Sequence, residues 1–567
     1  MHKLIKPALV CLLVAACAQD ARPSAVVPER ATSPVSEPTE QPVPAAVPDT
    51  IFYNAKIITM EDANPAAEAI AIAGDRILAL GTDEEVLAAS GPATRVIDLH
   101  GRTIVPGFID SHQHRIGDRA IGGYEQPDDV IQLAVEQGWT SLTELFEDEQ
   151  RLAELRALDQ AGKLRVRINA YLALANPQGQ SYGDWYQSYE PLTEYSPFLR
   201  LAGVKLYMDH GWGNGPVLWT QQQLNSMVAE AHARGWQVAS HTLSATAHTM
   251  ILDAMEKSLG GAATDPYRDR IEHVIVISDA DMQRMGRLGI LASIQLSGPG
   301  TWMDDPTFAT DVTPDLYPHF ARWRDLEDAG LVVLGSSDWP YGTLEPGFGS
   351  PMLLLYQAVT RTGTDRRAPE PWMLGQELTM EQALRSLTIN GAYGTFEEDE
   401  KGSLRAGKLA DLVILSDSPL TAAIESVPAI EVLMTMIGGK VEHCAPGQGS
   451  ICPETQAAST SAAASLFTGT WHGPDPDDGS TTTLVLVQTG NSLTGTFSDT
   501  YSGSVAPSGY EGEGSGRILS PTTAQMTFAL TRWDGKAAQV EYSLTLSDQN
   551  NTLTLGCAAG CPLVLQQ

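Results

Sequence analysis

The sequence predicts an α/β fold: a (β/α)₈ TIM barrel, a composite β-sandwich domain from both flanks of the barrel, and a separate C-terminal all-β module. Strand-like and helix-like segments alternate over residues 106–401, which is typical of a parallel sheet. Closely spaced short strands stand before and after this region. Beyond residue 466, polar and apolar residues alternate between turns rich in Gly, Asn and Ser, which is typical of an all-β module.

Residues 1–17 have the pattern of a signal peptide. Lys3 and Lys6 precede an apolar run, residues 8–16, which is far shorter than the roughly 20 residues that span a bilayer. The run ends at Cys17 in a Val-Ala-Ala-Cys sequence that resembles a bacterial lipobox. We therefore expect Cys17 to be lipidated and to anchor the protein. The alternative is an ordinary signal peptide that is cut nearby.

Residues 18–49 are predicted to form a disordered tether, because they are rich in Pro, Ala, Glu and Ser. Ala18 after the cysteine is compatible with transport to an outer membrane. We expect a bacterial cell-envelope protein, on the outer membrane facing the periplasm, that contacts the membrane through its lipid only.

The cysteines and the charge fit an exported protein. Beyond Cys11 in the signal and Cys17, the four other cysteines form two close pairs, which we expect to be disulfides in an oxidising compartment. A zinc site made from all four is the alternative. The pairs are Cys444 with Cys452 and Cys557 with Cys561.

The formal net charge of −33 argues against a nucleic-acid partner. The oligomeric state is left open.

Residues 50–105 and 402–445 are predicted to build the composite β-sandwich domain. Both segments contain short apolar runs at close intervals, and Gly74-Asp75 is expected to make a turn between two of them. A β layer that is split between the flanks of a barrel is most simply one domain. The expected strands are residues 51–58, 69–72, 76–80, 96–99, 103–105, 412–415, 431–436 and 440–441.

Residues 106–401 are predicted to form the TIM barrel. With the strand that precedes His112, eight strands are expected, the number that this barrel requires. Helical segments lie between them, for example residues 221–234, 280–288 and 323–329. The other seven strands are expected at residues 140–145, 166–172, 203–208, 237–241, 271–277, 290–294 and 331–336.

Residues 446–465 are predicted to be a linker, and residues 466–567 the C-terminal all-β module. Gly469-Thr470-Trp471 weakly resembles the start of small lipocalin-like barrels, and a plain β-sandwich is the alternative. The expected strands are residues 482–488, 492–497, 525–530, 540–546 and 552–555.

His112 and His114 follow the first barrel strand and are separated by one residue. Side chains two residues apart on a strand share a face, and neutral imidazole is the commonest metal ligand. Such a pair alone could be a chance occurrence in a loop. Four further residues of ligand type stand at later strand ends, where active sites of this barrel lie. They are Lys205, His241 and His273, on the fourth, fifth and sixth strands, and Asp338, directly after the eighth.

Each of these four residues also has a structural alternative. The lysine could reach past the strand end to water, each histidine could be a hydrogen-bonded core residue, and the aspartate could cap a helix. Their occurrence together, in this order, favours a metal centre.

With these residues, the chain resembles the metal-dependent amidohydrolase superfamily over roughly residues 50–442. The resemblance includes the segment from Gly402-Ser403-Leu404 to the strand that begins at Leu412. Two motifs, Arg270-Ile271-Glu272-His273 and Gly335-Ser336-Ser337-Asp338-Trp339-Pro340, resemble the amidohydrolase-3 branch, often called YtcJ-like.

The resemblance implies two divalent metal ions, usually zinc. Lys205 would bridge them as a carbamate, because an unmodified ammonium has no lone pair for a cation. A metal-activated hydroxide would attack a carbonyl carbon, with Asp338 as general base and then general acid. Asp110 could steady a histidine, and Arg270 and Glu272 are candidates for substrate contact. The more buried metal ion would have His112, His114 and Asp338 as ligands. The second metal ion would have His241 and His273 as ligands.

The sequence departs from the family pattern after Lys205, at Tyr207-Met208-Asp209-His210-Gly211, and after His241, at Thr242-Leu243-Ser244-Ala245. These departures leave the substrate open. We expect a metal-dependent hydrolase of C–N bonds, not peptide bonds preferentially, that acts on a small amide or N-acyl substrate. The alternatives are a deaminase or mononuclear-metal hydrolase of the same superfamily, or a non-catalytic envelope binding protein.

Overall fold

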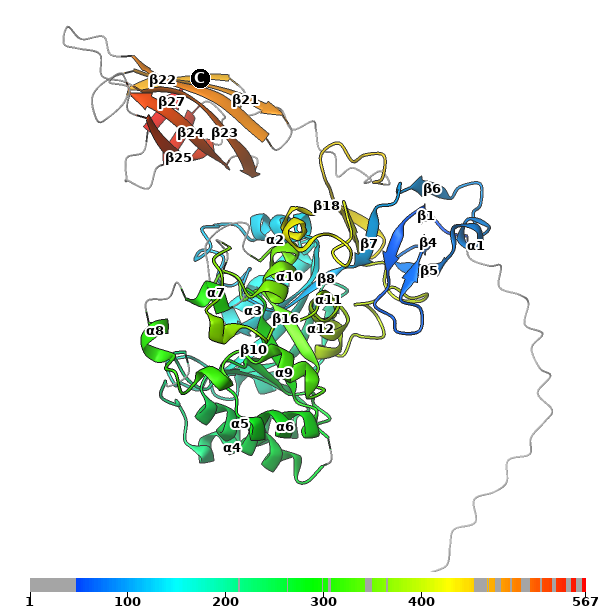
Figure 1. The fold of residues 1–567 in the computed structure, drawn as a ribbon, viewed down its shortest axis with the longest axis vertical. Helices are drawn as coiled ribbons and strands as arrows, with labels where there is room; N and C mark the ends of the chain where they lie inside the picture. Colours follow the sequence, from blue (N-terminus) through cyan, green and yellow to red (C-terminus); the bar gives the residue numbers. More distant parts are fainter. Residues whose placement is uncertain are drawn as a thin grey trace, which may run out of the picture. The chain divides into compact units, whose positions relative to one another are not determined.

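Figure 1 shows the computed structural model of the chain. The predicted signal peptide with Cys17, most of the tether, and the Cys557–Cys561 pair lie outside the described residues. The described residues are 47–212, 215–262, 264–297, 299–303, 307–341, 349–363, 366–452, 467, 469–474, 481–489, 492–500, 510–520, 523–532, 537–546, 552–556 and 563–566.

The central part is the predicted TIM barrel, so the predicted fold class is confirmed (Figure 1). Neighbouring barrel strands are parallel and follow chain order. The last strand meets the first through Asp338 N–H, which donates to His112 O at 2.8 Å, and His114 N–H, which donates to Trp339 O at 2.8 Å. The strands are β8 (Phe108–Gln113), β9 (Trp139–Glu147), β10 (Arg167–Ala175), β12 (Leu199–Tyr207), β13 (Gln237–Thr242), β14 (Arg270–His273), β15 (Leu291–Gln295) and β16 (Val333–Ser336).

Helices connect these strands and surround the barrel. Several begin at a side-chain cap: the Thr220 side chain, for example, accepts the backbone N–H of Gln223, which satisfies a donor that the helix leaves free. The short β11 (Glu194–Ser196) pairs antiparallel with β12. The helices are α2 (Pro127–Glu136), α3 (Glu149–Gln160), α4 (Gln221–Ala233), α5 (Ala245–Leu259), α6 (Asp279–Leu288), α7 (Pro299–Trp302), α8 (Phe308–Asp311), α9 (Trp323–Asp328), α10 (Pro351–Thr360), α11 (Met380–Ser386) and α12 (Ile389–Gly394).

The sixth barrel strand is shorter than predicted. The sequence predicts a strand over residues 271–277, but β14 ends at His273. His273 and Val274 have φ angles of 78° and 46°, and residues in this left-handed region cannot continue a strand. The apolar run 274–277 is buried as irregular chain.

Two sheets flank the barrel and come from both ends of the barrel sequence. One has the order β5-β4-β1-β6 and the other β19-β18-β17-β7-β2-β3. Strand β17 pairs antiparallel with β7, so the N-terminal and C-terminal flanks share one sheet. Apolar side chains of both sheets form a common core, as in a sandwich. The elements are β1 (Thr50–Tyr53), β2 (Lys56–Ile58), β3 (Ala66–Ala67), β4 (Ala69–Ala73), β5 (Arg76–Gly81), α1 (Asp83–Leu87), β6 (Arg95–Asp98), β7 (Thr103–Pro106), β17 (Leu412–Leu415), β18 (Val432–Ile437) and β19 (Lys440–Cys444).

Gly107 separates the flanking sheet from the barrel. The apolar run before His112 is divided there into β7 and β8. A β-carbon on Gly107 would lie 2.1 Å from Thr140 Oγ1, so the first two barrel strands approach closely only because this residue has no side chain.

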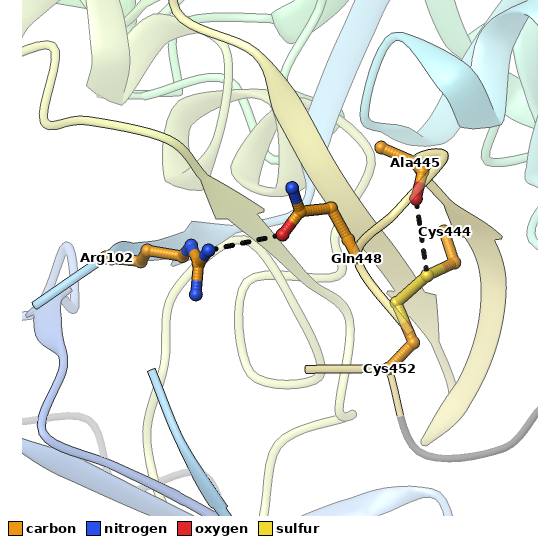
Figure 2. The surroundings of a disulfide bond; sticks show 5 residues. All are labelled: Arg102, Cys444, Ala445, Gln448 and Cys452. Carbon is orange, nitrogen blue, oxygen red and sulfur yellow. Dashed lines mark hydrogen bonds between the residues drawn. A yellow bond between two sulfur atoms is a disulfide. The ribbon is translucent and has the colours of Figure 1, made fainter. Parts of the chain in front are cut away.

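A disulfide joins Cys444 and Cys452, with an S–S distance of 2.03 Å. It closes the loop that follows β19 (Figure 2). In this loop, Gln448 Oε1 accepts a hydrogen bond from Arg102 at 3.2 Å, which links the two flanking segments.

The C-terminal module is a closed antiparallel barrel, one of the two folds expected. Its interior is filled by apolar side chains, including Trp471, Phe497 and Phe528. Strand β23 was not predicted, because its glycine-rich sequence has no apolar alternation. The glycines make room: a β-carbon on Gly514 would lie 2.4 Å from the Phe528 ring. The strands are β20 (Gly469–Pro474), β21 (Thr481–Thr489), β22 (Ser492–Thr500), β23 (Tyr510–Ser520), β24 (Thr523–Arg532), β25 (Ala537–Leu546), β26 (Thr552–Gly556) and β27 (Leu563–Gln566).

No helix in the described part of the chain has the length and apolar composition needed to cross a membrane.

Candidate metal centre

The predicted metal ligands lie at the carboxyl end of the barrel, on or directly after its strands. Because the strands are parallel, their carboxyl ends meet at one rim. Residues that are far apart in the sequence are thereby brought together from β8, β12, β13, β14 and the turn after β16. They are His112, His114, Lys205, His241, His273 and Asp338.

Asp338 lies between the histidines of the first and sixth strands. Its Oδ1 is 3.4 Å from His112 Nε2 and 3.6 Å from His114 Nε2. Its Oδ2 is 3.8 Å from His273 Nδ1. One ligand atom each from His112, His273 and Asp338 lies within 4.8 Å of the other two. These spacings suit donors that surround a cation.

His241 and His273 form the other side of the site. Their ring centroids are 4.3 Å apart, and the centroid of His273 is 4.8 Å from that of His112. The Nδ1 atom of His273 lies 2.7 Å from Gln295 Oε1. If Nδ1–H donates to this oxygen, Nε2 is left with its lone pair free. Gln295 was not predicted from the sequence, although its position at the end of the seventh strand was a signal.

Lys205 is fully buried on β12. Its Nζ lies 5.3 Å from the centroid of the Tyr207 ring. Burial is the main reason that the pKa of Lys205 falls to about 8. The structure thus places Lys205 at the rim of the fourth strand, as the sequence predicts.

Three buried polar atoms at the rim test whether the site fits a metal. Lys205 Nζ, His273 Nε2 and Asp338 Oδ1 have no hydrogen-bond partner among the described residues. An unpaired buried polar atom is costly in a folded protein. A nitrogen lone pair and a carboxylate oxygen would be satisfied by a cation, and a carbamylated lysine would supply further oxygens. The donor set therefore fits divalent metal.

The histidines are held neutral, which is the form that binds metal. Burial lowers the pKa values of His114 and His273 to about 3. It also lowers the pKa values of His112 and His241 well below the ordinary value.

Glu272 and Arg270 lie beneath the rim. Glu272 Oε2 is 2.7 Å from His112 Nδ1, and Glu272 Oε1 accepts a hydrogen bond from Arg270 Nε at 2.5 Å. Arg270 also donates to Ser111 O at 2.6 Å. Both side chains are completely buried, and neither lines the cavity above the site. Glu272 and Arg270 hold His112 in place. The sequence had suggested both as candidates for substrate contact.

Asp110 holds the turn that carries Asp338. Its carboxylate accepts the Ser337 N–H at 2.9 Å and the Ser337 hydroxyl at 2.5 Å. Burial raises the pKa of Asp110 to about 6. Asp110 therefore supports the aspartate of the site through Ser337, in addition to any effect on a histidine.

Asp118 and Tyr341 were not singled out from the sequence. Asp118 Oδ2 lies 3.7 Å from His114 Nδ1 and accepts a hydrogen bond from Tyr341 Oη at 3.1 Å. Arg151 donates to Asp118 Oδ1 at 2.5 Å. None of these three follows a predicted strand directly, so the sequence carried no signal for them.

A cavity of about 600 Å³ opens above the site. Its lining includes His241, His273 and Asp338 together with apolar side chains from the loops. A small molecule that fills this cavity would therefore lie directly against the candidate ligands.

Comparison with known proteins identifies the family. The sequence model of the Amidohydrolase family (Amidohydro_3) matches residues 128–443. The N-substituted formamide deformylase of Arthrobacter pascens is 23% identical, over 70% of this chain and 98% of that protein. An imidazolonepropionase of Symbiobacterium thermophilum is 28% identical, over 61% of this chain and 83% of that protein.

A solved structure has the same fold. An uncharacterised metal-dependent hydrolase from Pyrococcus horikoshii superposes with a TM-score of 0.55 at 17% identity, over 66% of this chain and 99% of that chain. The chain therefore belongs to the amidohydrolase family, in its amidohydrolase-3 branch, and is a metal-dependent amidohydrolase.

Proposed function

We propose that this protein hydrolyses the C–N bond of a small amide or N-acyl compound, with Asp338 as general base and general acid. Peptide bonds are not its preferred substrate. The observation that carries this proposal is the position of Asp338. Its Oδ1 has no hydrogen-bond partner among the described residues, faces two histidine nitrogens at 3.4 and 3.6 Å, and belongs to a residue that lines the cavity.

Asp338 can move a proton between the site and a substrate. Its carboxylate reaches the histidines of the first and sixth strands, while its side chain keeps 17% of its surface exposed. A proton that Oδ1 accepts on the metal side can therefore pass to the leaving nitrogen in the cavity. The arrangement through Asp110 and Ser337 keeps the carboxylate in this position.

We propose two divalent metal ions, with zinc as the expected metal. His112, His114 and Asp338 would hold one ion, and His241 and His273 the other. Lys205 would bridge them as a carbamate, which the unpartnered, buried Nζ supports. When bound, such ions lower the pKa of a water molecule and polarise the substrate carbonyl.

A single-metal enzyme is the second candidate. One ligand atom each from His112, His273 and Asp338 lies within 4.8 Å of the other two, which is compatible with a single ion shared by all three residues. A mononuclear hydrolase or a deaminase of the same family would use such a site. Metal stoichiometry distinguishes these candidates from the dinuclear enzyme.

We also propose that the protein is held in the bacterial cell envelope, on the outer membrane facing the periplasm, through a lipid on Cys17. The signal-like N-terminus supports this location, as does the disulfide between Cys444 and Cys452, because disulfides persist in oxidising compartments.

The test is elemental analysis of protein made with added zinc and bicarbonate, followed by a screen of amides and esters. Two zinc ions per chain and amide hydrolysis are expected. Lys205→Ala should lose the second metal and the activity, whereas Lys440→Ala, at an exposed lysine, should keep both. Two metals and full turnover in Lys205→Ala would contradict the dinuclear proposal. Metal-free protein that is inert on all substrates would favour a binding protein.

A further inference from the structure

The cavity above the metal centre has one large aromatic wall. The Trp212 and Trp302 ring centroids are 5.6 Å apart at an interplanar angle of 34°, and Phe308 meets Trp212 at 5.6 Å edge-on. Leu243 and Ile275 line the same cavity. Such a surface gains most from a flat apolar group, because aromatic pairs add to the ordinary effect of apolar burial.

The polar groups of the cavity outside the metal centre are neutral. Gln295 and Ser297 line it, and the Gln295 amide is already held by His273 and by Ser336 Oγ at 3.3 Å. Such groups can orient an amide by hydrogen bonds, but they cannot balance a full negative charge.

No lysine or arginine lines the cavity among the residues that the structure describes. The sequence extends this observation: residues 206–233, 295–321 and 325–360, which contribute most of the lining, contain neither residue type. Away from the metal centre, an anionic substrate group would therefore meet no cationic side chain of the described lining.

The arginines near the first strand do not supply a cation to this cavity. Arg151 is paired with Asp118 at 2.5 Å, and Arg119 with Glu154 at 2.8 Å. Both line a different cavity, of about 670 Å³. A substrate carboxylate would have to displace a protein carboxylate to reach either guanidinium.

Because Asp338 lines the cavity and is the proposed proton donor to the leaving nitrogen, we infer that the cavity takes the group on the nitrogen side of the scissile bond. We infer further that this group is apolar, preferably aromatic, and carries no carboxylate. The inference rests on the proposed function and names its substrate class: N-acyl derivatives of arylalkylamines rather than N-acyl amino acids or dipeptides. Away from the metal centre no cation lines the cavity among the described residues, so burying a carboxylate there costs much of its desolvation free energy. The neutral analogue does not have this cost.

The experiment uses a pair of substrates that differ only in the carboxylate: N-acetyl-2-phenylethylamine and N-acetylphenylalanine. The zinc-loaded enzyme should show a kcat/KM about 100-fold higher for the neutral compound. N-acetylmethylamine, which lacks the aryl group, should be a poorer substrate than N-acetyl-2-phenylethylamine. Equal or faster hydrolysis of N-acetylphenylalanine would overturn the inference.

Substitution of Trp212 tests the aromatic wall. Trp212→Ala should raise KM for N-acetyl-2-phenylethylamine about tenfold, with little change for N-acetylmethylamine, and Trp212→Phe should restore most of the loss. An equal loss for both substrates would indicate a structural role and would contradict the inference.

If the zinc-loaded protein hydrolyses neither phenyl compound, calorimetric binding of the two compounds to it separates this inference from the proposed function. Tighter binding of the neutral compound, by about tenfold or more, would support it even if no amide is hydrolysed. In that case the proposed function fails and the specificity of the cavity stands. Equal or tighter binding of N-acetylphenylalanine would overturn the inference whatever the turnover.

Discussion

Glu272 lies 2.7 Å from Nδ1 of His112, on the side of the ring opposite Asp338. The carboxylate fixes the ring so that Nε2 faces the metal centre, and Arg270 in turn fixes the carboxylate. Partners of this kind set the tautomer of a ligand histidine and raise its affinity for metal. The metal centre therefore depends on two buried residues that do not contact the substrate cavity.

Glu272→Gln is expected to weaken zinc binding by about 10- to 100-fold, because the amide cannot balance Arg270 or hold the ring as firmly. The measurement is a zinc titration against a chelator of known affinity. Glu431→Gln, at an exposed glutamate, is the control and should bind zinc normally. Unchanged affinity in Glu272→Gln would show that the ring is positioned by other contacts.

Arg167 and Asp411 join the barrel to the flanking sheet. Two hydrogen bonds of 2.7 and 2.9 Å connect them, and both side chains are almost fully buried. Arg167→Ala should lower the free energy of unfolding by about 3–5 kcal/mol, because it leaves the buried Asp411 carboxylate without its arginine partner. Chemical denaturation of the two proteins measures this change in the free energy of unfolding.

A matched exposed pair provides the control for this prediction. Lys163 and Asp128 are 3.0 Å apart, but each side chain keeps more than half of its surface in water. Lys163→Ala should therefore cost at most about 1 kcal/mol. Similar losses in the two variants would argue against a special role for the buried pair.

Gly107→Ala should destabilise the junction between β7 and β8. The added carbon would lie 2.1 Å from Thr140 Oγ1 and 2.3 Å from its Cγ2, so the first two barrel strands would have to separate. A loss of about 1–3 kcal/mol is expected from thermal or chemical unfolding. Gly449→Ala, where the new carbon meets nothing within 4 Å, should be nearly neutral. A stable Gly107→Ala protein would mean that Thr140 can move aside at little cost.

Asp209 should make the protein less stable as the pH rises. Burial raises the pKa of this carboxyl from 3.8 to about 6 in the folded protein. Between these values the folded state binds more protons than the unfolded state, so the free energy of unfolding falls as the pH increases, and the loss is complete above about pH 6.

Melting temperatures from pH 4 to 7 test this prediction. Asp209→Asn should flatten the decline, since the amide does not titrate. Asp399→Asn, at a side chain that is 92% exposed, should leave the decline as it is. An Asp209→Asn protein with the wild-type pH profile would assign the decline to other carboxyls.

The barrel was predictable from the sequence because its apolar strands alternate with helical segments and because several strands end in polar residues of ligand type. Lys205 illustrates this: a lysine within an apolar strand is unusual enough to be noticed, and the structure buries it on β12. The end of β14 was not predictable, since the turn at His273 comes from its backbone conformation and not from a glycine or proline.

The surroundings of the ligands were harder to predict than the ligands. Asp118 reaches His114 from a loop, and Gln295 reaches His273 from another strand. The contact of Asp118 depends on how its loop folds over the rim, which spacing in the chain does not show. The contact of Gln295 joins the ends of the neighbouring strands β14 and β15, so only its position at a strand end could have indicated it. Strand β23 was not predicted for another reason: its Gly514 makes room for the Phe528 ring on the next strand, a relationship that a local sequence pattern cannot show.

Removal of metal should lower the stability of the whole protein. The unpartnered atoms of His273 and Asp338 gain a partner when metal binds, as Lys205 would once carbamylated. A ligand that binds only the folded state stabilises it by mass action. At a free zinc concentration about 100 times the Kd, the gain is about 2.7 kcal/mol. Chelator-treated protein should therefore melt at a lower temperature, and added zinc should restore the melting temperature. His114→Ala should show a smaller restoration, because one ligand is lost while the fold is kept. A melting temperature that does not change with zinc would contradict metal binding at this site.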